Sequence, residues 1–273
     1  MPYRLSAFSD EISPDIQLQI DGLAENGIGF CCMRGVNGKN VLDLEDFQAN
    51  LASTQFRNRG IRFSALATLI GAGALSTPLE PELERLRKAA RLARLFETRV
   101  VRVFTFCLPP EEAPAAHRGE VLRRMKALAG TAKAEGVNLE IENTQGQYGG
   151  SATGQLEILE HIGSGHVRAA FDFVSFVKAG EEPLKAWELL RKHVVDFHVS
   201  DWRGSSQFAV QAGSGDGRVR EILQDAFASN WAGFVTLKPC LDKTPEHQGQ
   251  TGAQLFQTVA QALKTILAEV GAK

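Results

Sequence analysis

The stretch VNLEIEN, residues 137–143, alternates apolar with polar residues and carries a carboxylate, Glu142, close to its end. Such alternation is typical of a β-strand whose two faces meet different surroundings. Three later apolar runs also end in a polar residue, at Asp172, His198 and Lys238. The sequence therefore predicts four strands that deliver Glu142, Asp172, His198 and Lys238 to equivalent positions.

Predicted strands and helices alternate along the whole chain. The strands are predicted over residues 3–8, 28–33, 61–66, 99–106, 137–143, 167–173, 194–200 and 233–238. The helices are predicted over residues 13–26, 43–60, 81–96, 116–135, 153–162, 183–192, 218–229 and 252–270. This alternation favours a closed parallel barrel of the α/β class, the (β/α)8 TIM barrel, over an open doubly wound sheet. A single domain over residues 1–273 suits the length of the chain, since such barrels run to about 250 residues.

Capping residues and apolar spacing mark the first two helices. Ser13-Pro14-Asp15 supplies an N-cap, a proline for the first helical position and an early acid. Asp43 is predicted to cap the second helix, which carries Leu44, Phe47 and Leu51 on one apolar face.

The composition, 44% hydrophobic and 23% charged residues with a net charge of −2, is ordinary for a soluble globular protein. It gives no electrostatic reason to expect nucleic acid or an anionic membrane as a partner. The chain has no apolar run of the roughly 20 residues that span a bilayer, and its N-terminus lacks a signal-peptide core. We therefore expect a cytoplasmic protein. The cysteines show no Cys-x-x-Cys spacing, and the neighbours Cys31 and Cys32 are expected on opposite faces of one strand as structural thiols.

In a barrel strand, alternate side chains point toward the interior and toward the surrounding helices. With Leu139 and Ile141 facing the helices, Glu140 and Glu142 face the interior. The same alternation turns Asp172, Asp196, His198 and Lys238 inward from the following strands. Arg102 also faces inward beside Glu140, which predicts a buried ion pair of structural rather than catalytic importance.

Glu142, Asp172 and His198 are predicted to meet at the carboxyl ends of neighbouring strands, where barrel enzymes have their active sites. Their oxygen and nitrogen donors suit a divalent cation such as Mn²⁺, Mg²⁺ or Zn²⁺. One carboxylate at a strand end is more often an ion-pair partner or a helix cap, but three convergent donors favour a metal site.

Several short motifs recur in the order known from one family. They are Ser9-Asp10-Glu11-Ile12, Arg34-Gly35, Gly38-Lys39-Asn40, Glu142-Asn143, Phe171-Asp172, His198-Val199-Ser200-Asp201, residues 213–217 and Lys238-Pro239. Together they resemble the xylose isomerase-like barrels, the sugar phosphate isomerases and epimerases. The resemblance implies a small sugar-like substrate and a divalent metal held by Glu142, Asp172, His198 and an acidic residue on the last strand. It also implies that two glutamates transfer a proton next to the substrate carbonyl.

The last strand departs from this pattern, because Lys238 stands where the family has its glutamate. Three arrangements remain open. Lys238 turns aside and leaves a weakened metal site of three ligands; its ammonium replaces the metal by pairing with Glu142 or Asp172; or it acts as a base or Schiff-base former with a lowered pKa. With Glu142 and Lys238 as the catalytic candidates, the sequence favours a sugar or keto-sugar isomerase or epimerase. The alternative is a metal-free pseudoenzyme or carbohydrate-binding barrel.

Three further residues are candidates for contacting a sugar: Arg34, after the second strand, and Trp202 and Arg203, after the seventh. An exposed tryptophan packed on a helix or a second subunit is an equally good interpretation of Trp202. An abasic-site endonuclease of the same superfamily is excluded, since the chain has only scattered histidines and no basic excess. By the same resemblance a homo-oligomer is an expectation, although nothing in the chain sets the number of subunits.

Overall fold

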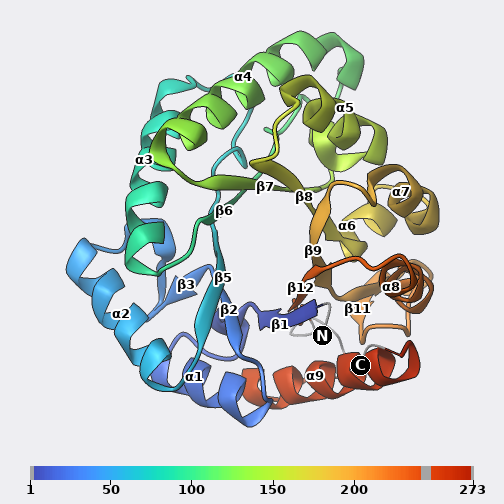
Figure 1. Ribbon diagram of the computed structural model, residues 1–273. Helices are drawn as coiled ribbons and strands as arrows, with labels where there is room; N and C mark the ends of the chain where they lie inside the picture. The colour runs from blue at the N-terminus through green and yellow to red at the C-terminus, as the bar shows by residue number, and fades with distance from the viewer. Residues whose placement is uncertain (1–2, 241–246, 272–273) are drawn as a thin grey trace.

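Eight parallel strands form a closed barrel in the computed structural model, which describes residues 3–240 and 247–271. Around the barrel the strands follow the order β1-β12-β9-β8-β7-β6-β5-β2, and helices surround them on the outside (Figure 1). The predicted single (β/α)8 barrel is confirmed. Within the described ranges, no helix is long and apolar enough to cross a membrane.

Each predicted strand and helix has a counterpart in this architecture. The barrel strands are β1 (Tyr3–Ala7), β2 (Phe30–Met33), β5 (Arg62–Ala67), β6 (Val100–Val103), β7 (Asn138–Glu142), β8 (Val167–Asp172), β9 (Val194–Val199) and β12 (Gly233–Leu237). The surrounding helices are α1 (Ile16–Glu25), α2 (Asp46–Asn58), α3 (Glu80–Leu95), α4 (Pro114–Glu135), α5 (Ala152–Ile162), α7 (Pro183–Leu190), α8 (Val219–Ala228) and α9 (Gly252–Glu269).

The connections contain short elements that the sequence pattern did not predict. They are the two-stranded pairs β3 (Gly35–Val36) with β4 (Lys39–Asn40) and β10 (Asp201–Arg203) with β11 (Phe208–Val210), the helix α6 (Phe173–Lys178), and the 3-10 turns η1 (Ser9–Glu11), η2 (Val41–Asp43) and η3 (Tyr148–Gly150). Most of them follow the carboxyl ends of barrel strands. They therefore enlarge the end of the barrel that carries the candidate site.

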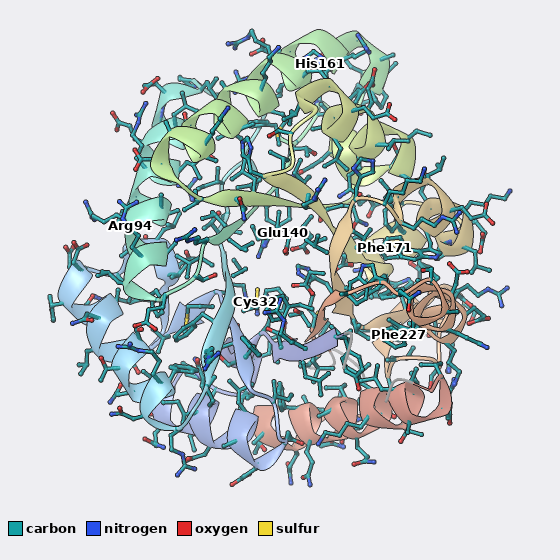
Figure 2. The ribbon with its side chains drawn as sticks, viewed as in Figure 1. Cys32, Arg94, Glu140, His161, Phe171 and Phe227 are labelled. Carbon is teal, nitrogen blue, oxygen red and sulfur yellow. The ribbon has the colours of Figure 1, made fainter. Side chains whose placement is uncertain are left out.

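The main hydrophobic core lies between the barrel and its helices. Aromatic rings fill it beside β8 and β9: Phe171 packs on Phe176 and Phe197 packs on Trp231, each pair with ring centroids 4.6 Å apart. Figure 2 shows Phe171 in this outer layer and Cys32 and Glu140 on the interior side of the barrel. Because alternate residues of β8 and β9 are fixed in this core, Asp172 and His198 between them must face the interior.

The predicted N-caps of the first two helices, Ser13 and Asp43, are wrong by two residues. The side chain of Asp15 accepts hydrogen bonds from the backbone N–H groups of Gln17 and Leu18, so it is the N-cap and α1 begins at Ile16. In the second helix, Glu45 and Gln48 form a capping box, and Asp43 instead ends the 3-10 turn before it.

The predicted apolar face of α2 is also wrong. Phe47 is 70% exposed and Leu51 59% exposed, whereas Ala49 and Ala52 are buried together with Phe56. Small side chains allow the helix to lie close to the barrel, so the face with two alanines packs inward. The apolar periodicity of this segment did not distinguish the two faces.

The fourth strand ends three residues earlier than predicted, at Val103. Gly71 allows the loop after β5 to lie against the residues that follow this strand, because an added Cβ there would lie 2.2 Å from the carbonyl oxygen of Phe104. The backbone N–H of Phe104 donates to the carbonyl of Ile70, and Phe106 has a positive φ of 68°. Hydrogen bonds from the backbone of Phe104 and Phe106 to the loop at Ile70 and Gly71 therefore replace the β-sheet hydrogen bonds that the sequence predicted.

Candidate functional site

Glu142, Asp172 and His198 come together at the carboxyl end of the barrel, as predicted. Asp172 and His198 are register partners in the β8–β9 ladder, and His198 is the register partner of Thr236 on β12. All three residues are buried, with at most 2% of each residue's surface exposed. Lys238 follows β12 directly and joins them from the other side.

The ammonium of Lys238 lies between the two carboxylates, Glu142 and Asp172. Its Nζ donates hydrogen bonds to Glu142 Oε1 at 2.8 Å and to Asp172 Oδ2 at 2.7 Å. Burial by itself would lower the pKa of Lys238, but the attraction of Asp172 and Glu142 raises the pKa above its ordinary value. The side chain is therefore a charged ammonium, which excludes the predicted alternative of a lysine with a lowered pKa.

Glu142 has two further cationic neighbours. Burial would raise the pKa of Glu142, but Lys238, Arg102 and His198 together hold it well below the ordinary value. Arg102 Nε lies 3.1 Å from Glu142 Oε2, and both side chains are almost fully buried. A carboxylate with such neighbours stays ionised and is a weak proton acceptor.

The predicted ion pair between Arg102 and Glu140 is therefore corrected to one between Arg102 and Glu142. Arg102 and Glu140 are indeed register partners on β6 and β7. The guanidinium, however, lies 4.4 Å from the ring centroid of Phe104, two residues further toward the mouth. The guanidinium of Arg102 therefore lies at the level of Glu142, two residues further along β7 than Glu140, its register partner.

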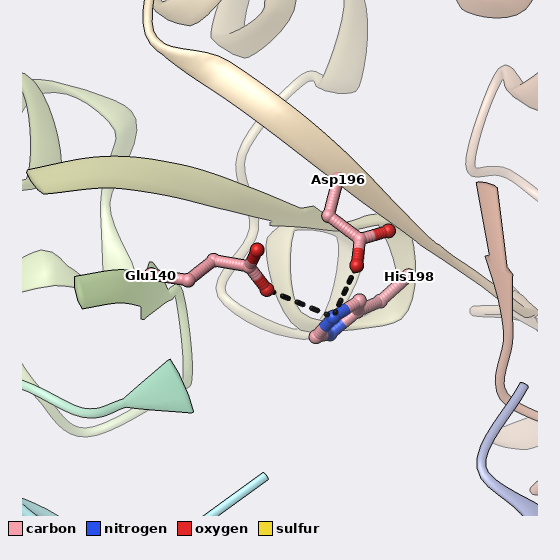
Figure 3. A group of neighbouring side chains, drawn as sticks. All are labelled: Glu140, Asp196 and His198. Carbon is pink, nitrogen blue, oxygen red and sulfur yellow. Dashed lines mark ion pairs between the residues drawn. The ribbon is translucent and has the colours of Figure 1, made fainter. Parts of the chain in front are cut away.

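A second carboxylate pair lies deeper in the barrel, around the other nitrogen of His198 (Figure 3). His198 Nε2 is 3.6 Å from Glu140 Oε1 and 3.7 Å from Asp196 Oδ2, and His198 Nδ1 is 3.2 Å from Glu142 Oε2. Burial would lower the pKa of His198, but these carboxylates raise the pKa well above its ordinary value. Burial, followed by the charge of Asp196, raises the pKa of Glu140 to about 7. The imidazole is therefore a buried cation among carboxylates.

The charges of this network are close to balance within the chain itself. The carboxyl groups are Glu140, Glu142, Asp172 and Asp196, and the cationic groups are Arg102, His198 and Lys238. Because Glu140 has a pKa of about 7, it is partly protonated at neutral pH. The buried charges are thus compensated by the side chains themselves.

The donor set has the composition of a metal site, but Lys238 conflicts with it. Ligand atoms of Glu142, Asp172 and His198 all lie within 4.8 Å of one another, which is close enough for one ion. Both carboxylates of this set, however, already bind the ammonium. A unit charge and a divalent ion about 4 Å apart repel by roughly 8 kcal/mol at an effective dielectric constant near 20. The residues in this arrangement do not fit the metal that the family resemblance implies.

A cavity of about 290 Å³ opens beside Lys238 at the mouth. Its lining is mostly polar and consists of Thr144, Gln145, Asp172, Val174, Ser175, Lys178, Ser200, Lys238 and Cys240. On its other side, the backbone N–H of Cys240 donates to Glu11 Oε2 at 2.7 Å, which connects the end of β12 to the loop after β1. Hydroxyl, amide and ammonium groups therefore converge on one small cavity.

The three predicted sugar contacts lie in different surroundings. Arg34 forms ion pairs with Asp10 and Glu11 and lines a neighbouring cavity of about 330 Å³. Trp202 forms a cation–π contact with Lys178, whose ammonium lies 3.9 Å from the centroid of the indole ring. Arg203 is exposed and donates to the carbonyl oxygen of Ser214, so it supports the glycine-rich loop. Their role toward a substrate stays a prediction.

The sequence analysis gave no role to two residues of the site. Phe8 is buried beneath the mouth, its ring edge-on to His198 with centroids 5.1 Å apart and its centroid 5.9 Å from Lys238 Nζ. Asp201 accepts backbone hydrogen bonds from Gly213, Gly215 and Gly217, each at 2.9 Å. A carboxylate three residues after His198, followed by alternating glycines, was the available signal for Asp201.

Comparisons with known proteins agree with this architecture. The sequence model of the family described as "Xylose isomerase-like TIM barrel" matches residues 21–264. No curated protein sequence matches the chain.

Solved structures of similar fold share little sequence with the chain. The IOLI protein with a bound zinc atom is 13% identical, with a TM-score of 0.79 over 99% of this chain and 100% of that one. The probable 3-DHS dehydratase AsbF from Bacillus anthracis is 16% identical, with a TM-score of 0.76 over 97% and 99%. The D-allulose 3-epimerase from Methylomonas sp., in complex with D-allulose, is 14% identical, with a TM-score of 0.73 over 98% and 97%. Since the family match covers nearly the whole chain, this protein belongs to the xylose isomerase-like TIM barrel family.

Proposed function

We propose that the protein binds a small sugar-like molecule at the mouth of its barrel without a divalent metal, and that it does not isomerise that molecule. The observation that carries the proposal is the Lys238 ammonium, which lies 2.8 Å from Glu142 and 2.7 Å from Asp172. It supplies a positive charge at the oxygen atoms that a metal would need. The ammonium is then the group that faces a sugar hydroxyl or carbonyl oxygen.

The lining of the mouth cavity supports a polyhydroxylated ligand. Ser175, Ser200 and Thr144 offer hydroxyl groups, and Gln145 offers an amide; each of these groups can both donate and accept hydrogen bonds. About 290 Å³ is at the lower end of the volumes of small-molecule sites. A similar barrel, the D-allulose 3-epimerase, has been solved with its sugar bound.

Proton transfer next to a carbonyl is less well supported than binding. Such a step needs a base whose pKa lies near the working pH. Lys238, Arg102 and His198 hold the pKa of Glu142 well below its ordinary value, so Glu142 is a poor acceptor of a carbon-bound proton. With Lys238 on the last strand there is also no second carboxylate there to return the proton.

Metal content, ligand binding and proton exchange together test this proposal. The purified chain should hold no stoichiometric Mn²⁺, Mg²⁺ or Zn²⁺ by elemental analysis, and calorimetry should detect binding of a ketohexose or ketopentose that is insensitive to chelator. In D₂O, the sugar should gain no deuterium at the carbon next to its carbonyl. Stoichiometric metal in the purified protein, or deuterium incorporation that a chelator stops, would contradict the proposal.

A metal-dependent sugar isomerase or epimerase is the second candidate. The observation that favours it is the spacing of Glu142, Asp172 and His198, whose donor atoms come within 4.8 Å of one another. It requires Lys238 to leave the two carboxylates. The same deuterium experiment, run with added Mn²⁺, decides between the two functions, because only the isomerase exchanges the proton.

A further inference from the structure

The opposite, amino end of the barrel carries several exposed arginines around a cavity. Ser6 and Ser64 face each other inside the barrel, with their Oγ atoms 2.7 Å apart. Arg4 and Arg62 stand two residues earlier on the same strands, β1 and β5, so the strand alternation turns them inward at the amino end. This end lies away from Lys238 and the mouth.

A cavity of about 300 Å³ occupies this amino end. Four arginines line it, Arg4, Arg57, Arg62 and Arg99, together with Glu97 and the rings of Phe30, Phe63, Phe96 and Phe234. Glu97 is the one acid of the lining, and it forms an ion pair with Arg57. The lining therefore carries an excess of three positive charges.

Aromatic rings, rather than an acidic partner, hold Arg4 in place. The guanidinium of Arg4 lies 4.0 Å from the ring centroid of Phe234 and 5.5 Å from that of Phe30, and the two rings are themselves in edge contact. Among residues 3–240 and 247–271, no carboxylate forms an ion pair with Arg4, Arg62 or Arg99. Their N–H donors are thus available to a ligand, and stacking on the rings limits the conformational entropy that Arg4 loses on binding.

We propose that this amino-end cavity, lined by Arg4, Arg57, Arg62 and Arg99, is a binding site for a phosphate group. A phosphate carries about −1.5 to −2 charges at pH 7, which the excess positive charge of the lining neutralises. The planar fork of arginine matches phosphate oxygens in pairs, a geometry that lysine does not offer. The phenylalanine rings add an apolar floor, so an aromatic phosphate ester binds more tightly than the free ion.

Calorimetric titration of the full chain with inorganic phosphate and with phenyl phosphate tests this site, at an ionic strength held constant with chloride. Arg62→Gln and Arg99→Gln should each raise the Kd about tenfold, a change of about 1.4 kcal/mol. The matched control is Arg59→Gln, which removes the same charge from an exposed arginine that pairs with Asp21 outside the cavity. Its Kd should equal that of the wild type.

A second control separates the two ends of the barrel. Lys178→Gln removes a cation from the mouth cavity and should leave phosphate binding unchanged. If Lys178→Gln weakens binding while Arg62→Gln does not, the anion binds at the mouth and the proposal fails. The proposal also fails if Arg62→Gln, Arg99→Gln and Arg59→Gln behave alike, or if phosphate gives no heat beyond that of chloride. A tighter Kd for phenyl phosphate than for inorganic phosphate would identify an ester as the better ligand, and equal Kd values would identify the free ion.

Discussion

Replacing Lys238 by methionine tests whether its ammonium compensates the buried carboxylates. The substitution keeps a long side chain but removes the partner that lies 2.8 Å from Glu142 and 2.7 Å from Asp172. Breaking a buried ion pair costs about 3–5 kcal/mol because a charge is left unpaired. Glu142 retains Arg102 and His198, so the cost should fall near the lower end, about 3 kcal/mol.

A divalent ion should recover much of this loss in Lys238→Met. With the ammonium gone, Glu142, Asp172 and His198 can hold the ion, and an ion present at about 100 times its Kd stabilises the folded state by about 2.7 kcal/mol. Urea unfolding followed by circular dichroism, with and without Mn²⁺ or Zn²⁺, measures both effects. Lys178→Met is the control, since Lys178 is a cation of the same cavity that contacts a ring rather than these carboxylates.

The reasoning is refuted if Lys238→Met is as stable as the wild type. It is equally refuted if the metal stabilises the wild type as much as the variant, because the ammonium would then not exclude the ion.

Two further substitutions address the network and the loop beside it. Glu140→Gln should change how the stability of the protein depends on pH. The pKa of Glu140 is about 7 in the folded protein and 4.5 in the unfolded chain, so between these two pH values the folded protein binds a proton that the unfolded chain has lost. The wild type therefore loses stability as the pH rises from 4.5 to 7. The glutamine variant lacks this loss, and its stability relative to the wild type should rise by about 3 kcal/mol over that range in urea titrations; parallel pH profiles would contradict the assignment. Asp201→Asn removes the negative charge of the carboxylate that accepts hydrogen bonds from three glycine N–H groups. It should destabilise the protein by about 2 kcal/mol and speed amide hydrogen exchange at residues 213–217. Unchanged exchange there would show that the loop does not depend on the carboxylate.

The sequence alone was sufficient to predict the barrel and the residues at its mouth. Period-two alternation on β7, β8, β9 and β12 determines which side chains face inward, and it brought Glu142, Asp172, His198 and Lys238 together as the structure has them. These predictions depend only on backbone geometry. They hold because a shift of one residue would bury the wrong face of every strand.

Contacts that depend on side-chain reach or close packing could not be predicted in this way. Arg102 forms its ion pair with Glu142 while its guanidinium packs on the ring of Phe104, a relation that spacing along a strand does not reveal. The buried face of α2 carries alanines, because small side chains let the helix lie close to the barrel and the larger apolar side chains of Phe47 and Leu51 face outward. Asp201 organises a loop of distant glycines, and only the fold shows that they meet.

The position of Lys238 along the chain has a consequence for folding. It follows β12, the last strand of the barrel, and it is 96 residues from Glu142 and 66 residues from Asp172. During synthesis, β7 and β8 therefore emerge long before the ammonium that balances their carboxylates. Until β12 inserts between β9 and β1, those two acids have to stay hydrated or protonated, so the interior of the barrel can become dry only when the final strand closes it.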